Sequence, residues 1–338
     1  MHNFKKIVIH TLLLLLFTIL LLIVFVIPYF KGQSYYYQDY KVRKSLSGKI
    51  DTLIIGSSHA LRSINPTVLN EQLGVSSYNL ASPVMSMYGR YTLLKKEVER
   101  NPIKTVIIDV SYNAMTLDRK SLGFEGDIYV LGRFDNIYDR INFFFKAFSF
   151  DEYAKVLSDT VKRSKYTIEN PATKEPSQYT SYGFIPVETN DQSLSLDIKK
   201  SILNTESFDT VMKKENLDYF NDMIELCKNN NIRVILVVIP VTEHMILRYD
   251  NNDEVFSQYV TLAKKYGIEY YDFNLDKKRT KLYSDKESFY DYSHLSELGA
   301  NVFSNRLAKI LKQINEGKDV SNEFYTSYEQ IKEAILKV

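Results

Sequence analysis

The chain begins with a long apolar segment. Ile7 to Phe30 contains no Asp, Glu, Lys or Arg. As a helix that rises about 1.5 Å per residue, it would reach roughly 36 Å, enough to cross a hydrocarbon core of about 30 Å. No A-x-A pattern follows, as a cleaved signal peptide would favour, and no polar stripe interrupts it, as a buried core helix would show. Residues 1–30 are therefore predicted to form a retained membrane anchor.

The cations around this segment predict its orientation. Lys5 and Lys6 precede it, so the short N-terminal end is expected in the cytoplasm. Lys31, Arg43 and Lys44 follow it and weaken this argument. The expected protein crosses the cell membrane once and carries its C-terminal domain on the extracytoplasmic side.

After a polar connector at residues 31–50, apolar runs alternate with helical patterns. This alternation is typical of an α/β fold whose central parallel sheet is covered on both faces. We expect this domain to span residues 51–316. The predicted strands are Thr52–Ile55, one within VSSYNLAS, Thr105–Ser111, Arg233–Ile239 and IEYYDF.

Two parts of the chain depart from this alternation. Residues 118–204 combine two short amphipathic helix patterns with a polar, turn-rich stretch, so we interpret them as an insertion and not as a second domain. Residues 317–338 form a polar tail that is predicted to be helical. No internal repeat is present.

Composition adds three limits. The chain is 45% hydrophobic and 25% charged, as is common for a globular protein. Its formal net charge of +2 gives no indication of a nucleic-acid partner. Cys227 is the only cysteine, which excludes an intrachain disulfide.

Two short segments carry the candidate chemistry. GSSH, residues 56–59, directly follows the first strand, and DYSH, residues 291–294, directly precedes the last long helix pattern. Catalytic groups of open α/β sheets gather at the carboxyl ends of strands, where the N–H groups of a helix start can face a developing oxyanion. An Asp three residues before a His can accept its Nδ1–H and leave Nε2 to take a proton from a serine.

Each of these residues also has an ordinary structural explanation. Ser57 and Ser58 could cap a helix, since serine is favoured there. Asp291 could be a turn residue and His294 a surface histidine. The combination is more specific than any one of its members.

The same segments resemble the first and last blocks of the SGNH (GDSL-like) hydrolase superfamily. The resemblance implies a flavodoxin-like three-layer sandwich and no cofactor. It selects Ser58 as the nucleophile, because this serine lies two positions after Gly56. D-x-x-H supplies Asp291 and His294, and the HLSELGA continuation is similar to that of the family.

The middle blocks of the family match less well. Asn113 corresponds to the oxyanion asparagine of a G-x-N-D block, although the glycine and the aspartate are missing. No glycine occupies the expected oxyanion position after the second strand, and Gly89 comes later. A backbone N–H near Ser82 to Met85 is expected to serve instead.

Among SGNH proteins, the anchor, GSS in place of GDS and IPVTEH after a central strand most resemble DltD-type and related cell-envelope members. These work beside membrane-bound O-acyltransferases (MBOAT). The resemblance implies esterase or acyl-transfer chemistry on acetyl or D-alanyl esters of a polymer such as teichoic acid or exopolysaccharide. The alternative is a non-catalytic accessory subunit, which the weak middle blocks favour and the intact D-x-x-H opposes.

Three further residues are candidates for the pocket. Ser57 and His59 flank the nucleophile, and His59 has a packing role as its alternative. His244 follows the most hydrophobic strand, beside Glu243. A metal site there would need a third convergent ligand, so no metal is predicted.

Overall fold

The computed structural model describes residues 2–21, 35–111, 113–134, 136–166, 182–193 and 195–337. The chain divides into two compact units. The smaller unit joins Met1–Lys41 to Leu131–Lys174, and the larger joins Val42–Val130 to Glu175–Val338. Part of the segment expected as an insertion therefore groups with the N-terminal residues.

The described residues of the smaller unit are mostly helical. It contains α1 (His2–Leu21), most of α3 (Tyr35–Ser45), α9 (Ile137–Ala147) and α10 (Tyr153–Tyr166). Phenylalanines form its core, with the Phe143 ring centroid 5.4 Å from that of Phe134.

The N-terminal segment expected to cross the membrane, Ile7–Phe30, continues beyond α1 into residues outside the described part of the chain. Within the described part, none of the helices has both the length and the apolar character that crossing a membrane requires.

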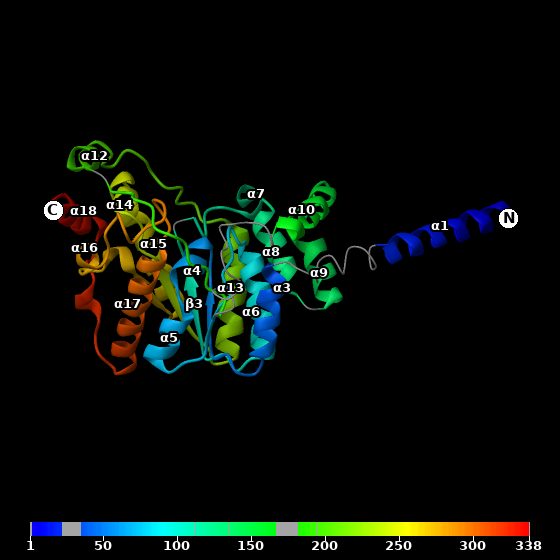
Figure 1. Ribbon diagram of the computed structural model, residues 1–338, viewed down its shortest axis with the longest axis horizontal. Helices are drawn as coiled ribbons and strands as arrows, with labels where there is room; N and C mark the ends of the chain where they lie inside the picture. The colour runs from blue at the N-terminus through cyan, green and yellow to red at the C-terminus, as the bar shows by residue number, and fades with distance from the viewer. Residues whose placement is uncertain are drawn as a thin grey trace. The chain divides into compact units, whose positions relative to one another are not determined.

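The larger unit is built on a parallel sheet in the order β2-β1-β3-β4-β5 (Figure 1). Its strands are β1 (Thr52–Ile55), β2 (Ser77–Asn79), β3 (Thr105–Asp109), β4 (Arg233–Val238) and β5 (Glu269–Asp272). This confirms the predicted α/β fold with a central parallel sheet, and the strand order is the flavodoxin-like one.

Helices cover both faces of this sheet (Figure 1). Ile54, Ile107 and Ile235 lie side by side in register and pack into one core cluster with α17. The face with these residues is covered by α4 (Ser58–Ser63), α5 (Pro66–Leu73) and α17 (Glu297–Asn315). The opposite face is covered by α6 (Met87–Arg100), α13 (Lys214–Asn229) and α15 (Asn252–Tyr266).

Short helices fill the connections. They are α7 (Arg119–Leu122), α8 (Glu125–Arg133), α12 (Leu196–Ser201), α14 (Glu243–Arg248) and α16 (Arg279–Leu282). Two single 3-10 turns add to these, Phe273–Leu275 and Ser321–Glu323. The tail contains α18 (Tyr328–Leu336), and the buried Tyr328 hydroxyl donates to Asp272 Oδ2 at 2.8 Å. This bond ties the tail to the carboxyl end of β5.

The start of α17 packs very closely on the segment that leads to Asp291. Ser296 caps this helix and accepts a hydrogen bond from the Gly299 N–H at 3.2 Å. A Cβ atom on Gly299 would lie 2.0 Å from the Ser288 carbonyl oxygen. Only glycine allows this approach.

Gly299→Ala is expected to lower the free energy of unfolding by about 1–3 kcal/mol, because the added methyl forces the helix and Ser288 apart. Denaturant unfolding measures the effect. Asn305→Ala, on the exposed side of the same helix, is the control and should change stability by less than about 0.5 kcal/mol. Equal stability of the two variants would contradict the close packing.

Candidate active site

Ser58 is the first residue of α4, directly after the turn that ends β1. Gly56 forms this turn, and a Cβ atom there would lie 2.5 Å from Asp109 Cβ and 2.7 Å from Ala60 Cβ. Ser57 is the N-cap of α4, and its side chain accepts a hydrogen bond from the His59 N–H at 3.2 Å. The capping role expected of a serine therefore belongs to Ser57, and Ser58 keeps its hydroxyl for other contacts.

A buried carboxylate fixes this turn from the neighbouring strand. Asp109 Oδ2, at the end of β3, accepts hydrogen bonds from the Ser57 N–H at 3.1 Å and the Ser57 hydroxyl at 2.7 Å. Asp109 Oδ1 accepts from the Ser111 N–H at 3.0 Å. Sequence reasoning missed this residue, although a carboxylate that ends a run of buried apolar residues was a usable signal.

The second segment forms a short loop that is held by its own aspartate. The Tyr290 N–H donates to the His294 carbonyl oxygen at 2.9 Å and closes the loop. Asp291 Oδ1 accepts from the backbone N–H groups of Ser293 and His294, both at 2.8 Å. The loop geometry therefore brings the carboxylate next to the His294 ring.

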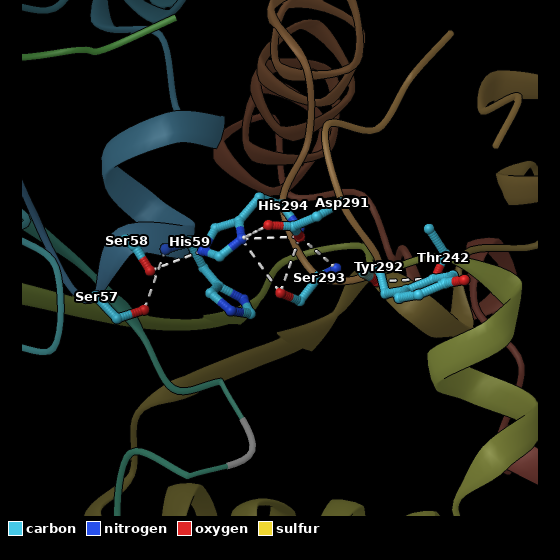
Figure 2. Close-up of polar contacts among 8 residues, drawn as sticks. All are labelled: Ser57, Ser58, His59, Thr242, Asp291, Tyr292, Ser293 and His294. Atoms are coloured by element: carbon cyan, nitrogen blue, oxygen red, sulfur yellow. Dashed lines mark hydrogen bonds and ion pairs between the residues drawn. The ribbon is translucent and has the colours of Figure 1, made fainter. Parts of the chain in front are cut away.

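Ser58, His294 and Asp291 form a continuous hydrogen-bonded chain (Figure 2). His294 Nδ1 lies 2.9 and 2.8 Å from the two Asp291 carboxylate oxygens, and Nε2 lies 2.8 Å from Ser58 Oγ. An ionised carboxylate only accepts hydrogen bonds, so the proton is on Nδ1. Nε2 is then free to accept the proton of the Ser58 hydroxyl.

The electrostatics of Asp291 agree with this proton arrangement. Burial by itself would raise the pKa of Asp291, but the hydrogen bonds from His294 and Ser293 outweigh it and hold the pKa well below its usual range. Asp291 is therefore ionised at neutral pH and stabilises a positive charge on the ring beside it.

One backbone donor at Ser58 is unoccupied. The Ser57 N–H is bonded to Asp109 and the His59 N–H to Ser57 Oγ, whereas the Ser58 N–H has no acceptor among the described residues. The first N–H groups of a helix lack partners within the helix. The Ser58 N–H can therefore donate to an oxyanion formed next to its own side chain.

Two other oxyanion donors were expected, a backbone N–H near Ser82 to Met85 and the side chain of Asn113. Within the stretch from Ser82 to Met85, the Ser82 N–H is not available, because it already donates to the Gly56 carbonyl oxygen at 3.2 Å. Asn113 is exposed in the turn after β3. None of the hydrogen bonds between described residues joins its side chain to Ser58 or His294.

His59 packs against the ring of His294. The two ring centroids lie 4.8 Å apart at an interplanar angle of 63°, and His59 lies below His294 in Figure 2. Burial, and then the proximity of His294, lower the pKa of His59 to about 4. His59 is therefore neutral at pH 7 and does not oppose the charge that His294 gains when it accepts a proton.

His244 lies on the other side of the loop. Its ring stacks on Tyr292 with centroids 4.1 Å apart, and its Nε2 accepts from Arg248 at 3.1 Å. Glu243 pairs with Lys199 at 2.5 Å. In the described ranges, no group of three His, Cys, Asp or Glu side chains is arranged to hold a metal ion.

Comparisons with known proteins give only distant likenesses. No protein-family model and no curated protein matches the chain. Among solved structures, a proposed acylhydrolase from Bacteroides fragilis has 12% identity and a TM-score of 0.39, covering 82% of this chain and 96% of its own. A GDSL-like lipase from Bacteroides thetaiotaomicron has 10% identity and a TM-score of 0.38, covering 84% and 98%. The acetyl xylan esterase of the rumen bacterium Butyrivibrio proteoclasticus has 8% identity and a TM-score of 0.31, covering 80% and 65%.

The low pKa of His59 has a consequence for stability. Between pH 6.5 and about 4 the unfolded chain binds a proton at His59 that the folded chain does not bind, so this residue makes the folded state less stable as the pH falls. His59→Gln is expected to remove that dependence. The difference in unfolding free energy between variant and wild type, measured by urea titration from pH 4.5 to 7.5, should change across this window. A constant difference would show that His59 is not shielded as described.

Proposed function

We propose that the chain is a serine esterase or O-acyltransferase of the SGNH type, with Ser58, His294 and Asp291 as its catalytic triad. The observation that carries this proposal is the 2.8 Å contact from Ser58 Oγ to His294 Nε2, with Asp291 on the other ring nitrogen. A hydroxyl is a weak nucleophile until a base takes its proton, and this arrangement supplies the base.

In the first half-reaction, Ser58 Oγ attacks the carbonyl carbon of an acyl ester while His294 Nε2 takes the hydroxyl proton. The Ser58 N–H donates to the oxyanion of the tetrahedral intermediate. His294 then gives its proton to the leaving alcohol, and the acyl group remains on Ser58. Asp291 stays ionised throughout and stabilises the protonated ring.

In the second half-reaction, a new hydroxyl attacks the acyl-enzyme while His294 takes its proton. The bond between the acyl carbon and Ser58 Oγ then breaks as His294 returns the proton to Ser58 Oγ. Water as the attacking group gives hydrolysis, and a polymer hydroxyl gives transfer. Both outcomes use the same residues, so the acceptor distinguishes an esterase from a transferase.

The cellular setting of this activity is also part of the proposal. The uncharged Ile7–Phe30 segment after Lys5 and Lys6 supports a single-pass anchor with an extracytoplasmic catalytic domain. GSS in place of GDS, together with IPVTEH, supports a DltD-type role beside an MBOAT protein. The proposed substrates are acetyl or D-alanyl esters of teichoic acid or of an exopolysaccharide.

Ser58→Ala, His294→Ala and Asp291→Asn are each expected to lower ester hydrolysis by at least about 10³-fold, because triad members act as a unit. The full chain in detergent with p-nitrophenyl acetate provides the assay, and a fluorophosphonate probe should label wild type but not Ser58→Ala. Ser57→Ala should stay within about tenfold of wild type, since it removes a helix cap, one bond to Asp109 and a 3.5 Å contact with Ser111 Oγ, while the Ser57 N–H still donates to Asp109.

Two results would contradict this assignment. If Ser57→Ala were inactive and Ser58→Ala active, the nucleophile would be the wrong serine of the pair. If wild type showed neither hydrolysis nor labelling while folding normally, the accessory-subunit alternative would replace the enzyme.

The proposed membrane orientation can be tested by protease accessibility. Protease added to intact cells should cleave the C-terminal domain, because the charge pattern around Ile7–Phe30 predicts that this domain lies outside the membrane. Immunoblotting with a C-terminal tag follows the cleavage, and a cytoplasmic protein serves as the control for lysis. Protection in intact cells with cleavage after lysis would reverse the orientation.

A further inference from the structure

Two exposed tyrosines flank Asp291 in the loop that carries His294. Tyr290 and Tyr292 have 40% and 41% of their surface exposed, although each is next in sequence to a triad member. In Figure 2, Tyr292 lies beyond Asp291 and Ser293 as seen from Ser58. A ligand attached to the acyl group at Ser58 could therefore extend along the loop to this ring.

Tyr292 is held in one orientation by the segment after β4. Its carbonyl oxygen accepts hydrogen bonds from the Thr242 N–H at 3.1 Å and the Thr242 hydroxyl at 2.8 Å. Its ring stacks on His244 with centroids 4.1 Å apart and planes 24° apart. The imidazole backs one side of the phenol ring, so a ligand meets a surface that needs little further ordering.

Tyr290 is supported from the nucleophile helix. The Arg62 guanidinium carbon, on α4, lies 5.4 Å from the centroid of the Tyr290 ring. Tyr290 therefore lies on the side of the loop that faces α4. The loop thus presents one exposed aromatic ring before Asp291 and one after it, Tyr290 and Tyr292.

The charges near Tyr292 argue against a phosphate-rich ligand. Beside Tyr292, Arg248 is paired with Glu206 and Lys199 with Glu243, and the guanidinium of Arg62 lies over the Tyr290 ring. A polyol phosphate would favour cations without such partners, because each phosphate brings a negative charge. A sugar ring instead offers weakly positive C–H groups to the negative face of an aromatic ring, and hydroxyls to nearby charged side chains.

We propose that Tyr292 is a specificity-determining residue that stacks on a sugar ring of the polymer, so that the substrate is a pyranose-containing polysaccharide ester and not a polyol phosphate ester. The proposal deepens the proposed function and rests on Ser58 being the nucleophile. Binding of a distant sugar contributes to the rate when it positions the reacting ester, so its loss should affect large substrates far more than small ones.

The kinetic test compares two substrates on the full chain in detergent. Tyr292→Ala should lower kcat/KM for acetylated hexasaccharides of β-glucan, chitin and mannan type at least about tenfold more than for p-nitrophenyl acetate. Tyr292→Phe should retain the wild-type ratio, because it keeps the ring. Tyr138→Ala, which removes an exposed ring of the smaller unit, should change neither rate. Equal losses on both substrates would indicate a merely structural role and overturn the proposal.

A binding test keeps this inference separate from the chemistry. Calorimetry with Ser58→Ala and the unacetylated hexasaccharides should show binding that Tyr292→Ala weakens about tenfold and Tyr292→Phe preserves. The proposal is overturned if none of the hexasaccharides binds, if Tyr292→Ala binds them unchanged, or if a glycerol-phosphate hexamer binds more tightly. Sugar binding by a protein that lacks hydrolysis and fluorophosphonate labelling would instead overturn the proposed function alone.

Discussion

The buried carboxylate of Asp109 fixes the geometry on which the candidate site depends. It accepts three hydrogen bonds from the turns that follow β1 and β3, which offset the cost of burying its charge. The parallel register pairs Ile54 with Ile107 and Ile55 with Ile108, so the next residues along, Gly56 and Asp109, meet at the sheet edge. This edge is the point where the strand order reverses, the usual place for a site in such sheets. The position of Ser58 is therefore a consequence of strand pairing in the core.

The histidine reaches the serine from 236 positions later in the chain. Helix packing brings the two together, because α17 follows the histidine loop and packs on α4 and α5. Asn65, between those two helices, donates from its backbone to Ser304 Oγ and from its side chain to Asn301 Oδ1, both at 2.8 Å. These bonds hold α17 in position against α4. The 2.8 Å contact between Ser58 and His294 therefore depends on polar contacts between helices at some distance from it.

Sequence patterns were sufficient for the elements whose stability comes from apolar burial. The five strands are short apolar or mixed runs, and their helices repeat apolar residues at helical spacing, so both were predictable. Helix α3 was not predictable in this way, because its sequence is polar, and its residues were expected to belong to the connector at residues 31–50. Its buried Arg43 pairs with Glu97, a contact that no local pattern records.

Some residues of the candidate site were likewise predictable from local patterns, and others were not. D-x-x-H and the serine after glycine are local patterns, and the structure brings Ser58, Asp291 and His294 together. Asp109 and Thr242 act through contacts between segments far apart in the chain, which spacing cannot reveal. Of the N–H groups expected near Ser82 to Met85, that of Ser82 is occupied for a related reason, since its acceptor, the Gly56 carbonyl oxygen, is set by the turn geometry.

For the proposed activity, the exposure of the site bears on whether water or a polymer hydroxyl receives the acyl group. The His294 side chain is 17% exposed and that of Asp291 is 40% exposed, so the site lies at the surface. A surface site does not exclude water, and an acceptor hydroxyl must then compete by being held in position. Positioning of this kind can supply effective concentrations far above those of free reactants. For the proposed activity, the choice between hydrolysis and transfer is consequently decided less by the triad than by the side chains beside it that hold the acceptor.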